Sequence, residues 1–187
     1  MTRVIAAICA KAGRVPRAAA LLAAVTMTGQ AIAEPSPLLH LVQNNRISWT
    51  PWSNGETPLL PFAGGRDTNG QALYVCAASH NGGRHPGKVN ASLRGCNFGY
   101  GGREITARNY MVLTAMQQLS WTPSSGGSVP RDALRAGQEN NGRPLFVCRA
   151  DFRNSRQLGK VGGSLRGCNF GYGGREYTVT SYEVLTQ

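Results

Sequence analysis

The chain has 187 residues, of which 20 are lysine or arginine and nine are aspartate or glutamate, so its formal net charge is +11 at pH 7. Such an excess favours association with polyanions but does not specify a fold. The sequence has no lysine or arginine run, no zinc-finger spacing and no aromatic-interleaved RNA motif, so we expect no specific nucleic-acid partner. The spread of the charge is typical of a solvated basic surface.

The first 33 residues are typical of a secretory signal peptide. Four basic residues are combined with an apolar run from Ala18 to Met27 that is too short to span a bilayer, and Ala31-Ile32-Ala33 predicts cleavage before Glu34. The alternative is an uncleaved anchor, but no later apolar run approaches transmembrane length. We therefore expect a secreted or periplasmic protein without a transmembrane span, in which 16 basic and nine acidic residues leave a net charge of +7.

A tandem duplication makes up most of the remaining chain. The thirteen residues from Ser92 to Glu104 recur unchanged from Ser164 to Glu176, and a shift of 72 positions aligns the surrounding sequence with 36 identities in 67 positions. Two copies of one unit predict internal pseudo-symmetry. We divide the chain into a signal peptide (1–33), an N-terminal leader (34–47), repeat one (48–114), a linker (115–119) and repeat two (120–187).

The cysteine pattern predicts two disulfides. Outside the expected signal peptide the cysteines form an even set without a C-x-x-C pair, which favours disulfides over zinc or redox chemistry in an exported chain. The four are Cys76, Cys96, Cys148 and Cys168. The equal spacing favours bonds within each copy, but in a simple meander the partners would lie two strands apart, about 9 to 10 Å, beyond the roughly 7 Å that a disulfide tolerates. Bonds within a copy therefore require neighbouring first and third strands, and the alternative is bonds between copies.

The hydrophobic pattern predicts an all-β fold. The run from Ala72 to Ala78 is rich in β-forming residues and lies between Asn-Gly turn signals, which indicates a strand entering a hairpin. Further strands are expected at 87–92, 95–100, 104–107 and 110–114, with equivalents 72 residues later, whereas 48–65 is interpreted as turn-rich. No segment after Asn45 has a convincing helical period. Two units of about 70 residues each bury only a modest core alone, so we expect two antiparallel units that share a core.

Both copies carry the same ordered series of motifs: Trp, Pro, Gly-x-Asp/Glu, Asn-Gly-x-x-Leu-Tyr/Phe-Val, Gly-Lys-Val, Tyr-Gly-Gly-Arg-Glu and Tyr-x-Val-Leu. This series resembles the DM-nine repeat family, whose small β modules occur in tandem in mannose-binding lectins and beside pore-forming domains in some toxin-like proteins. The resemblance covers residues 48–187. It implies two antiparallel β units related by a pseudo-two-fold axis.

The resemblance also implies a sugar site, formed by the acidic residue of the Gly-x-Asp motif and the lysine of Pro-Gly-Lys. These residues are Asp67 and Lys88 in copy one, and Glu139 and Lys160 in copy two. Glutamate in place of aspartate, and Leu158 in place of the proline, depart from the pattern in copy two, so we expect a weaker second site there.

The chemistry of an acid and a lysine suits a sugar. A carboxylate accepts hydrogen bonds from two adjacent hydroxyls, an ammonium donates to hydroxyl oxygens, and charge-assisted bonds of this kind contribute roughly 1.5 to 3 kcal/mol each. The alternative is that Asp67 caps its own turn and Lys88 lies on a solvated strand. Tyr100 and Tyr172 are candidate platforms for a sugar ring, or core residues. The Arg-Glu pairs at 103–104 and 175–176 are either a second site or structural ion pairs.

The expected function is therefore carbohydrate binding without catalysis. The partners are glycans or cell-surface polysaccharide, with a homodimer as a further option, and no cofactor or metal is expected. One alternative is a basic polyanion binder. Another is a glycosidase that uses Asp67 and Glu104, although no catalytic serine or metal-binding histidine motif is present.

Overall fold

The computed structural model describes residues 47–162 and 164–187. The expected signal peptide and nearly all of the expected leader lie outside these residues. Within them the protein is all-β, with fourteen strands in one sheet and one short 3₁₀ turn. No helix in the described part is both long enough and apolar enough to cross a membrane.

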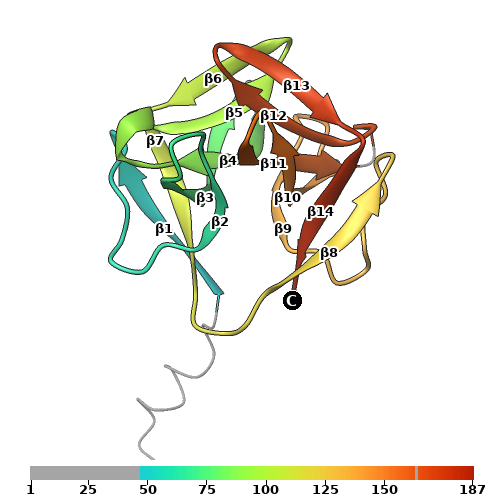
Figure 1. The fold of residues 1–187 in the computed structure, drawn as a ribbon, viewed down its shortest axis with the longest axis horizontal. Helices are drawn as coiled ribbons and strands as arrows, with labels where there is room; N and C mark the ends of the chain where they lie inside the picture. Colours follow the sequence, from blue (N-terminus) through green and yellow to red (C-terminus); the bar gives the residue numbers. More distant parts are fainter. Residues whose placement is uncertain (1–46, 163) are drawn as a thin grey trace, which may run out of the picture. The chain divides into compact units, whose positions relative to one another are not determined.

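Each copy contributes seven strands in matching order (Figure 1). The first copy supplies β1 (Ile47–Ser53), β2 (Ala63–Arg66), β3 (Ala72–His80), β4 (Gly83–Val89), β5 (Cys96–Tyr100), β6 (Arg103–Ala107) and β7 (Asn109–Ala115). The second copy supplies β8 (Ser120–Ser125), β9 (Arg135–Gln138), β10 (Pro144–Phe152), β11 (Ser155–Gly162), β12 (Cys168–Tyr172), β13 (Arg175–Val179) and β14 (Ser181–Thr186).

Two local expectations were wrong. The stretch expected to be turn-rich contains β1 and β2, because β1 pairs with β7 along its whole length and takes a place at the end of the sheet, where Pro51 is tolerated. Residues 91–92, expected in a strand, belong to the 3₁₀ turn Ala91–Leu93. The Asn90 side chain starts this turn by accepting the backbone N–H groups of Ser92 and Leu93.

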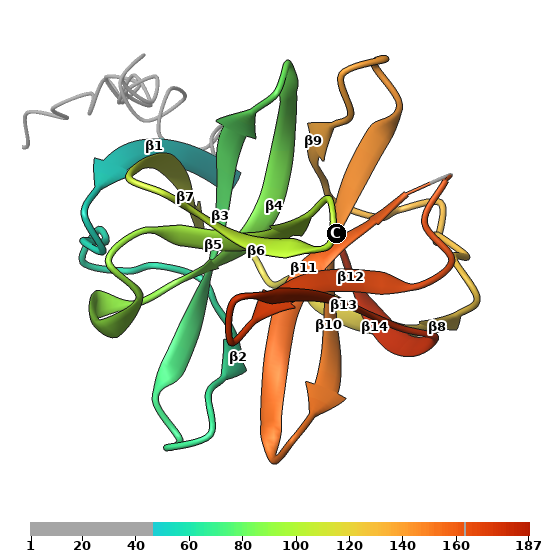
Figure 2. The same cartoon turned by 90° about the horizontal axis from the view of Figure 1, so that it is seen from above.

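The sheet has the expected pseudo-two-fold symmetry. Its strand order is β1-β7-β3-β2-β11-β12-β13-β6-β5-β4-β9-β10-β14-β8, which reads the same from either end when equivalent strands of the two copies are exchanged. The copies are joined by three pairings, β2 with β11, β4 with β9, and β6 with β13. In Figure 2, β6 and β13 lie side by side at the centre of the view.

The two copies also share a hydrophobic core, as expected. One buried cluster draws on both copies and consists of Leu73, Val75, Leu113, Leu134, Ala136, Val147, Leu158 and Leu185. Two further clusters each belong to one copy and surround its disulfide. Because apolar side chains alternate along the strands, one face of each unit is left for the other unit to cover.

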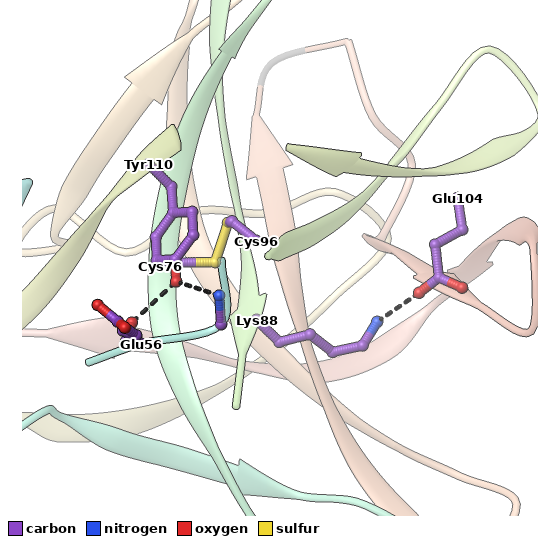
Figure 3. The surroundings of a disulfide bond; sticks show 7 residues. Glu56, Cys76, Lys88, Cys96, Glu104 and Tyr110 are labelled. Atoms are coloured by element: carbon purple, nitrogen blue, oxygen red, sulfur yellow. Dashed lines mark hydrogen bonds and ion pairs between the residues drawn. A yellow bond between two sulfur atoms is a disulfide. The ribbon is translucent and has the colours of Figure 1, made fainter. Parts of the chain in front are cut away.

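The disulfides join cysteines within each copy, Cys76 to Cys96 and Cys148 to Cys168, with Cα atoms 5.9 and 5.7 Å apart. The distance expected for a flat meander does not apply, because β5 pairs with β4 only at Asn97 and Lys88 and does not lie flat beside it along its length. Gly87 is the cross-strand partner of Cys76, and a Cβ on Gly87 would lie 2.3 Å from the Asn97 oxygen of β5. The missing side chain lets β5 approach and brings Cys96 over Cys76. Figure 3 shows this bond in the buried cluster that also holds Tyr110.

Candidate functional site

The repeated Gly-Gly-Arg-Glu segments meet where β6 and β13 pair. Gly102 and Gly174 have positive φ angles of 81° and 82°, so each segment forms a tight turn between two strands. The Glu104 carboxylate accepts the Gly174 N–H at 3.0 Å, and the Glu176 carboxylate accepts the Gly102 N–H at 2.6 Å. Each glutamate therefore closes the turn of the other copy. This exchange gives the longest identical segment of the sequence a structural role.

Lys88 of β4 extends into the same region and is only 3% exposed. Its Nζ lies 3.1 Å from Glu104 Oε1 (Figure 3). The same Nζ also donates to the Gly171 carbonyl of the second copy. Burial lowers the pKa of Lys88, and Glu104 opposes that shift. Lys88 is therefore a buried member of an ion pair and does not lie on a solvated strand.

Asp67 lies in the turn that follows β2. Its Oδ1 accepts the backbone N–H groups of Asn69 at 3.1 Å and Gln71 at 2.9 Å, so Asp67 caps its own turn. Within residues 47–162 and 164–187, the carboxylate that pairs with Lys88 comes from Glu104 and not from Asp67.

Lys160 of β11 is equally buried, at 2% exposed, but its surroundings differ from those of Lys88. Its Nζ donates to His85 Nδ1 at 3.0 Å and lies 5.3 Å from the centroid of the Tyr100 ring. In the described part of the chain no carboxylate lies within ion-pair distance of Lys160. Burial lowers the pKa of Lys160, while Glu139 and Glu176 are near enough to raise it.

Glu139 occupies the turn after β9, in the position of Asp67. The backbone of this turn is closed by the Glu139 N–H to the Arg143 carbonyl at 2.9 Å, and Asn141 caps it by accepting the Arg143 N–H. Among the described residues no hydrogen bond ends on the Glu139 carboxylate. This carboxylate, the buried ammonium of Lys160 and two residues of the first copy, His85 and Tyr100, form what we call the lysine-160 site.

The role of His85 follows from its protonation state. Burial, and secondarily the charge of Lys160, lower the pKa of His85 to about 4 from 6.5. The ring is therefore neutral at pH 7, with its Nε2 3.3 Å from the His80 carbonyl, which leaves Nδ1 as an acceptor for Lys160. The ring also stacks on Phe98 at a centroid distance of 5.4 Å.

His85 was not among the site residues that we predicted from the sequence. The signal was present in the differences between the copies, since Gln157 occupies the position of His85, and Phe152 that of His80. Tyr100 was named only as a candidate platform. Tyr110 is a core residue, because its hydroxyl accepts the Gly55 N–H and donates to the Glu56 carbonyl.

A family model described as the DM9 repeat matches residues 9–107 and 99–179. No curated protein matches the chain. Among solved structures, the nematode sperm cell motility protein MFP2B is similar to this chain with a TM-score of 0.55 and 15% sequence identity. The match covers 74% of this chain but only 46% of MFP2B, and at this identity it establishes a common fold alone.

Proposed function

The chain belongs to the DM9 repeat family, and from that premise we propose that it is a secreted carbohydrate-binding protein for mannose or mannose-like glycans. The proposed binding residues are the acid and lysine of each repeat, Asp67 with Lys88 and Glu139 with Lys160. The lysine-160 site carries the proposal, because it combines a buried ammonium, a nearby carboxylate without a hydrogen-bonded partner in the described chain, and an aromatic ring.

The chemistry of this site suits two adjacent hydroxyls of a sugar ring. An ammonium has three donors, and His85 takes one of those of Lys160. The remaining donors can bind hydroxyl oxygens, while the Glu139 carboxylate accepts from the hydroxyl protons. Tyr100 supplies an aromatic surface for the C–H face of the ring.

The site in copy one has less capacity to spare. Lys88 already donates to Glu104 and Gly171, and Asp67 Oδ1 holds two backbone N–H groups. Asp67 Oδ2 takes no hydrogen bond from the described residues. The sequence departures in copy two predicted a weaker site there, but because Lys88 and Asp67 are already occupied, we now expect the lysine-160 site to be the stronger of the two. Two sites on one chain would also hold a multivalent glycan more tightly than a monosaccharide.

Binding is favoured over hydrolysis by the state of the glutamates. A glycosidase needs a pair of carboxylates free to act on the substrate. Glu104 is held by Lys88 and the Gly174 N–H, and Glu176 by the Gly102 N–H.

Two disulfides support export, since such bonds persist in oxidising compartments.

Calorimetric titration with methyl mannoside tests the proposal. We expect Glu139→Gln to weaken binding roughly tenfold, because it removes one charge-assisted acceptor. The control is Asp132→Asn, an exposed acid of the same copy, which should bind as the parent does. No hexose binding by the parent would overturn the proposed function, and undiminished binding by Glu139→Gln would overturn the site.

Two further measurements separate the alternatives. A basic polyanion binder loses affinity steeply as salt is raised, whereas neutral-sugar binding should change little. Release of reducing ends from a labelled oligosaccharide would indicate a hydrolase, and retention without release would support a lectin.

A further inference from the structure

The two copies differ around one arginine that both retain. In copy two, Arg156 of β11 makes two parallel hydrogen bonds to Asp151, from Nε at 2.8 Å and from Nη2 at 3.1 Å. Its Nη1 lies 3.9 Å from the Glu183 carboxylate. The hydrogen bonds to Asp151 raise the pKa of Arg156. The Glu183 carboxylate accepts its own two hydrogen bonds from Arg149, at 2.7 and 3.2 Å, so the Arg156 guanidinium is neutralised mainly by Asp151.

In copy one the equivalent residue is Arg84, and both carboxylates are missing. Ser79 occupies the position of Asp151, and Met111 that of Glu183. Within residues 47–162 and 164–187, Arg84 Nε and Nη2 are buried and have no hydrogen-bond partner. These are the two nitrogens that Arg156 uses to bind Asp151. Burial lowers the pKa of Arg84, whereas that of its counterpart is raised.

The position of Arg84 follows from a third difference. In copy two, Arg149 lies over the Trp121 ring at 4.2 Å from its centroid. The residue equivalent to Arg149 is Ala77. Arg84 fills the vacated place and lies 5.1 Å from the centroid of the Trp49 ring. Arg84 therefore lies against an aromatic ring, and no carboxylate of the described residues forms an ion pair with it.

Arg84 also separates two hollows of the surface. One has a volume of about 710 Å³ and is lined by Trp52, Ser79 and Met111, among others. The second, of about 530 Å³, lies between the copies and includes Trp49 and Gln138. Both volumes fall within the range of small-molecule sites, roughly 300 to 1,000 Å³.

We propose that Arg84 anchors a second ligand site, in the hollow beside Trp52, that binds the carboxylate of an acidic sugar such as a uronic acid. The Asp151 carboxylate shows in copy two the geometry that the ligand would adopt in copy one. Because the Nε–Nη2 edge of Arg84 is buried, the ligand must draw the guanidinium away from Trp49. Two parallel charge-assisted bonds replace the contact with the ring.

An acidic sugar fits this hollow better than a bare anion. The walls include the apolar side chains of Pro51, Trp52 and Met111, which suit the C–H face of a sugar ring. Trp52 is partly exposed and is replaced by Ser124 in copy two, so the aromatic wall and the unneutralised arginine occur in the same copy. This site is independent of the lysine-160 site and of mannose.

Titration with D-glucuronate, followed by calorimetry and tryptophan fluorescence, tests the proposal. The parent should bind glucuronate but not D-glucose, and its fluorescence should change as Arg84 leaves Trp49. Arg84→Lys keeps the charge but loses the paired bonds, so binding should weaken roughly tenfold or more. Arg156→Lys is the matched control and should leave glucuronate binding unchanged, because Asp151 already occupies that guanidinium.

A second variant tests the neutralisation directly. Met111→Glu introduces a carboxylate at the position of Glu183, and it can pair with Arg84 because Ala77 replaces the Arg149 that binds Glu183 in copy two. This variant should therefore abolish glucuronate binding and leave mannoside binding as in the parent. Glucuronate binding that survives both Arg84→Lys and Met111→Glu would overturn the site. Acetate bound as tightly as glucuronate would overturn the assignment to an acidic sugar.

Discussion

Removing one partner of the buried ion pair between Lys88 and Glu104 should strongly destabilise the junction of the copies. The side chains are 4% and 11% exposed, and Nζ and Oε1 lie 3.1 Å apart. Glu104→Gln keeps the shape of the side chain but leaves the ammonium in the interior without a counter-charge. Breaking one side of a buried pair typically costs about 3 to 5 kcal/mol.

Deprotonation of Lys88 sets an upper limit on the free energy that this substitution costs. The variant can relieve the unpaired charge by releasing the proton of Lys88, which at pH 7 costs at most about 5 kcal/mol, because the usual pKa is 10.5 and each unit is worth about 1.4 kcal/mol. The Gly171 carbonyl and the new amide oxygen recover part of this. We expect a loss of about 2 to 4 kcal/mol in the free energy of unfolding at pH 7.

Glu176→Gln is the matched control in the other copy. Glu176 accepts the Gly102 N–H but forms no ion pair within the described residues, so its replacement should cost only about 1 to 2 kcal/mol. Urea unfolding followed by tryptophan fluorescence at pH 7 and at pH 9 measures both variants.

The pH dependence has a definite sign. In Glu104→Gln the pKa of Lys88 in the folded state falls further below its unfolded value, so the unfolded chain binds more protons and stability rises with pH. Glu104→Gln should therefore regain stability from pH 7 to pH 9 relative to Glu176→Gln. Equal losses in the two variants, or no difference in their response to pH, would refute the reasoning.

Three further predictions concern stability. The pKa of His85 is about 4 in the folded chain, so the unfolded chain binds more protons between pH 6.5 and pH 4. The free energy of unfolding of the parent should therefore fall by on the order of 2 kcal/mol over this range through His85. In urea unfolding, His85→Gln should lose that much less than the parent. Replacing both Cys76 and Cys96 by alanine removes a disulfide that spans a sequence separation of 20. This should lower the free energy of unfolding by about 3 kcal/mol, seen as a lower denaturant midpoint. Gly87→Ala would place a Cβ 2.3 Å from the Asn97 oxygen and should cost about 3 kcal/mol or more in thermal unfolding.

Each of these has a control in the chain. Copy two already accommodates glutamine at the position of His85, as Gln157, so His85→Gln should fold. For the disulfide, the same midpoint with and without reductant in the parent would contradict the prediction. For Gly87, the comparison is Gly70→Ala, whose new Cβ would meet no atom within 4 Å. Its cost should be only about 1 to 2 kcal/mol, because Gly70 has a positive φ that alanine adopts with strain. A smaller loss for Gly87→Ala than for Gly70→Ala would show that β5 moves aside.

The sequence by itself determined the local features of this protein. Short apolar runs bounded by turn signals, such as Ala72 to Ala78, specified strands, the 72-residue shift specified two equivalent units, and the even set of cysteines specified two disulfides. These features depend on neighbours along the chain or on composition. The weakly apolar β1 and β2 were missed because their strand character comes from their pairing partners.

Only the tertiary structure decided which copy each element packs against. A duplicated sequence presents the same motif twice, so no local pattern distinguishes a glutamate that closes its own turn from one that closes the turn of the other copy. Lys88 therefore meets Glu104 and a carbonyl of the second copy, whereas Lys160, with the same neighbours in sequence, meets His85. The copies are joined by the pairings of β2 with β11, β4 with β9 and β6 with β13. These pairings join residues far apart in the sequence, so no local pattern specifies them.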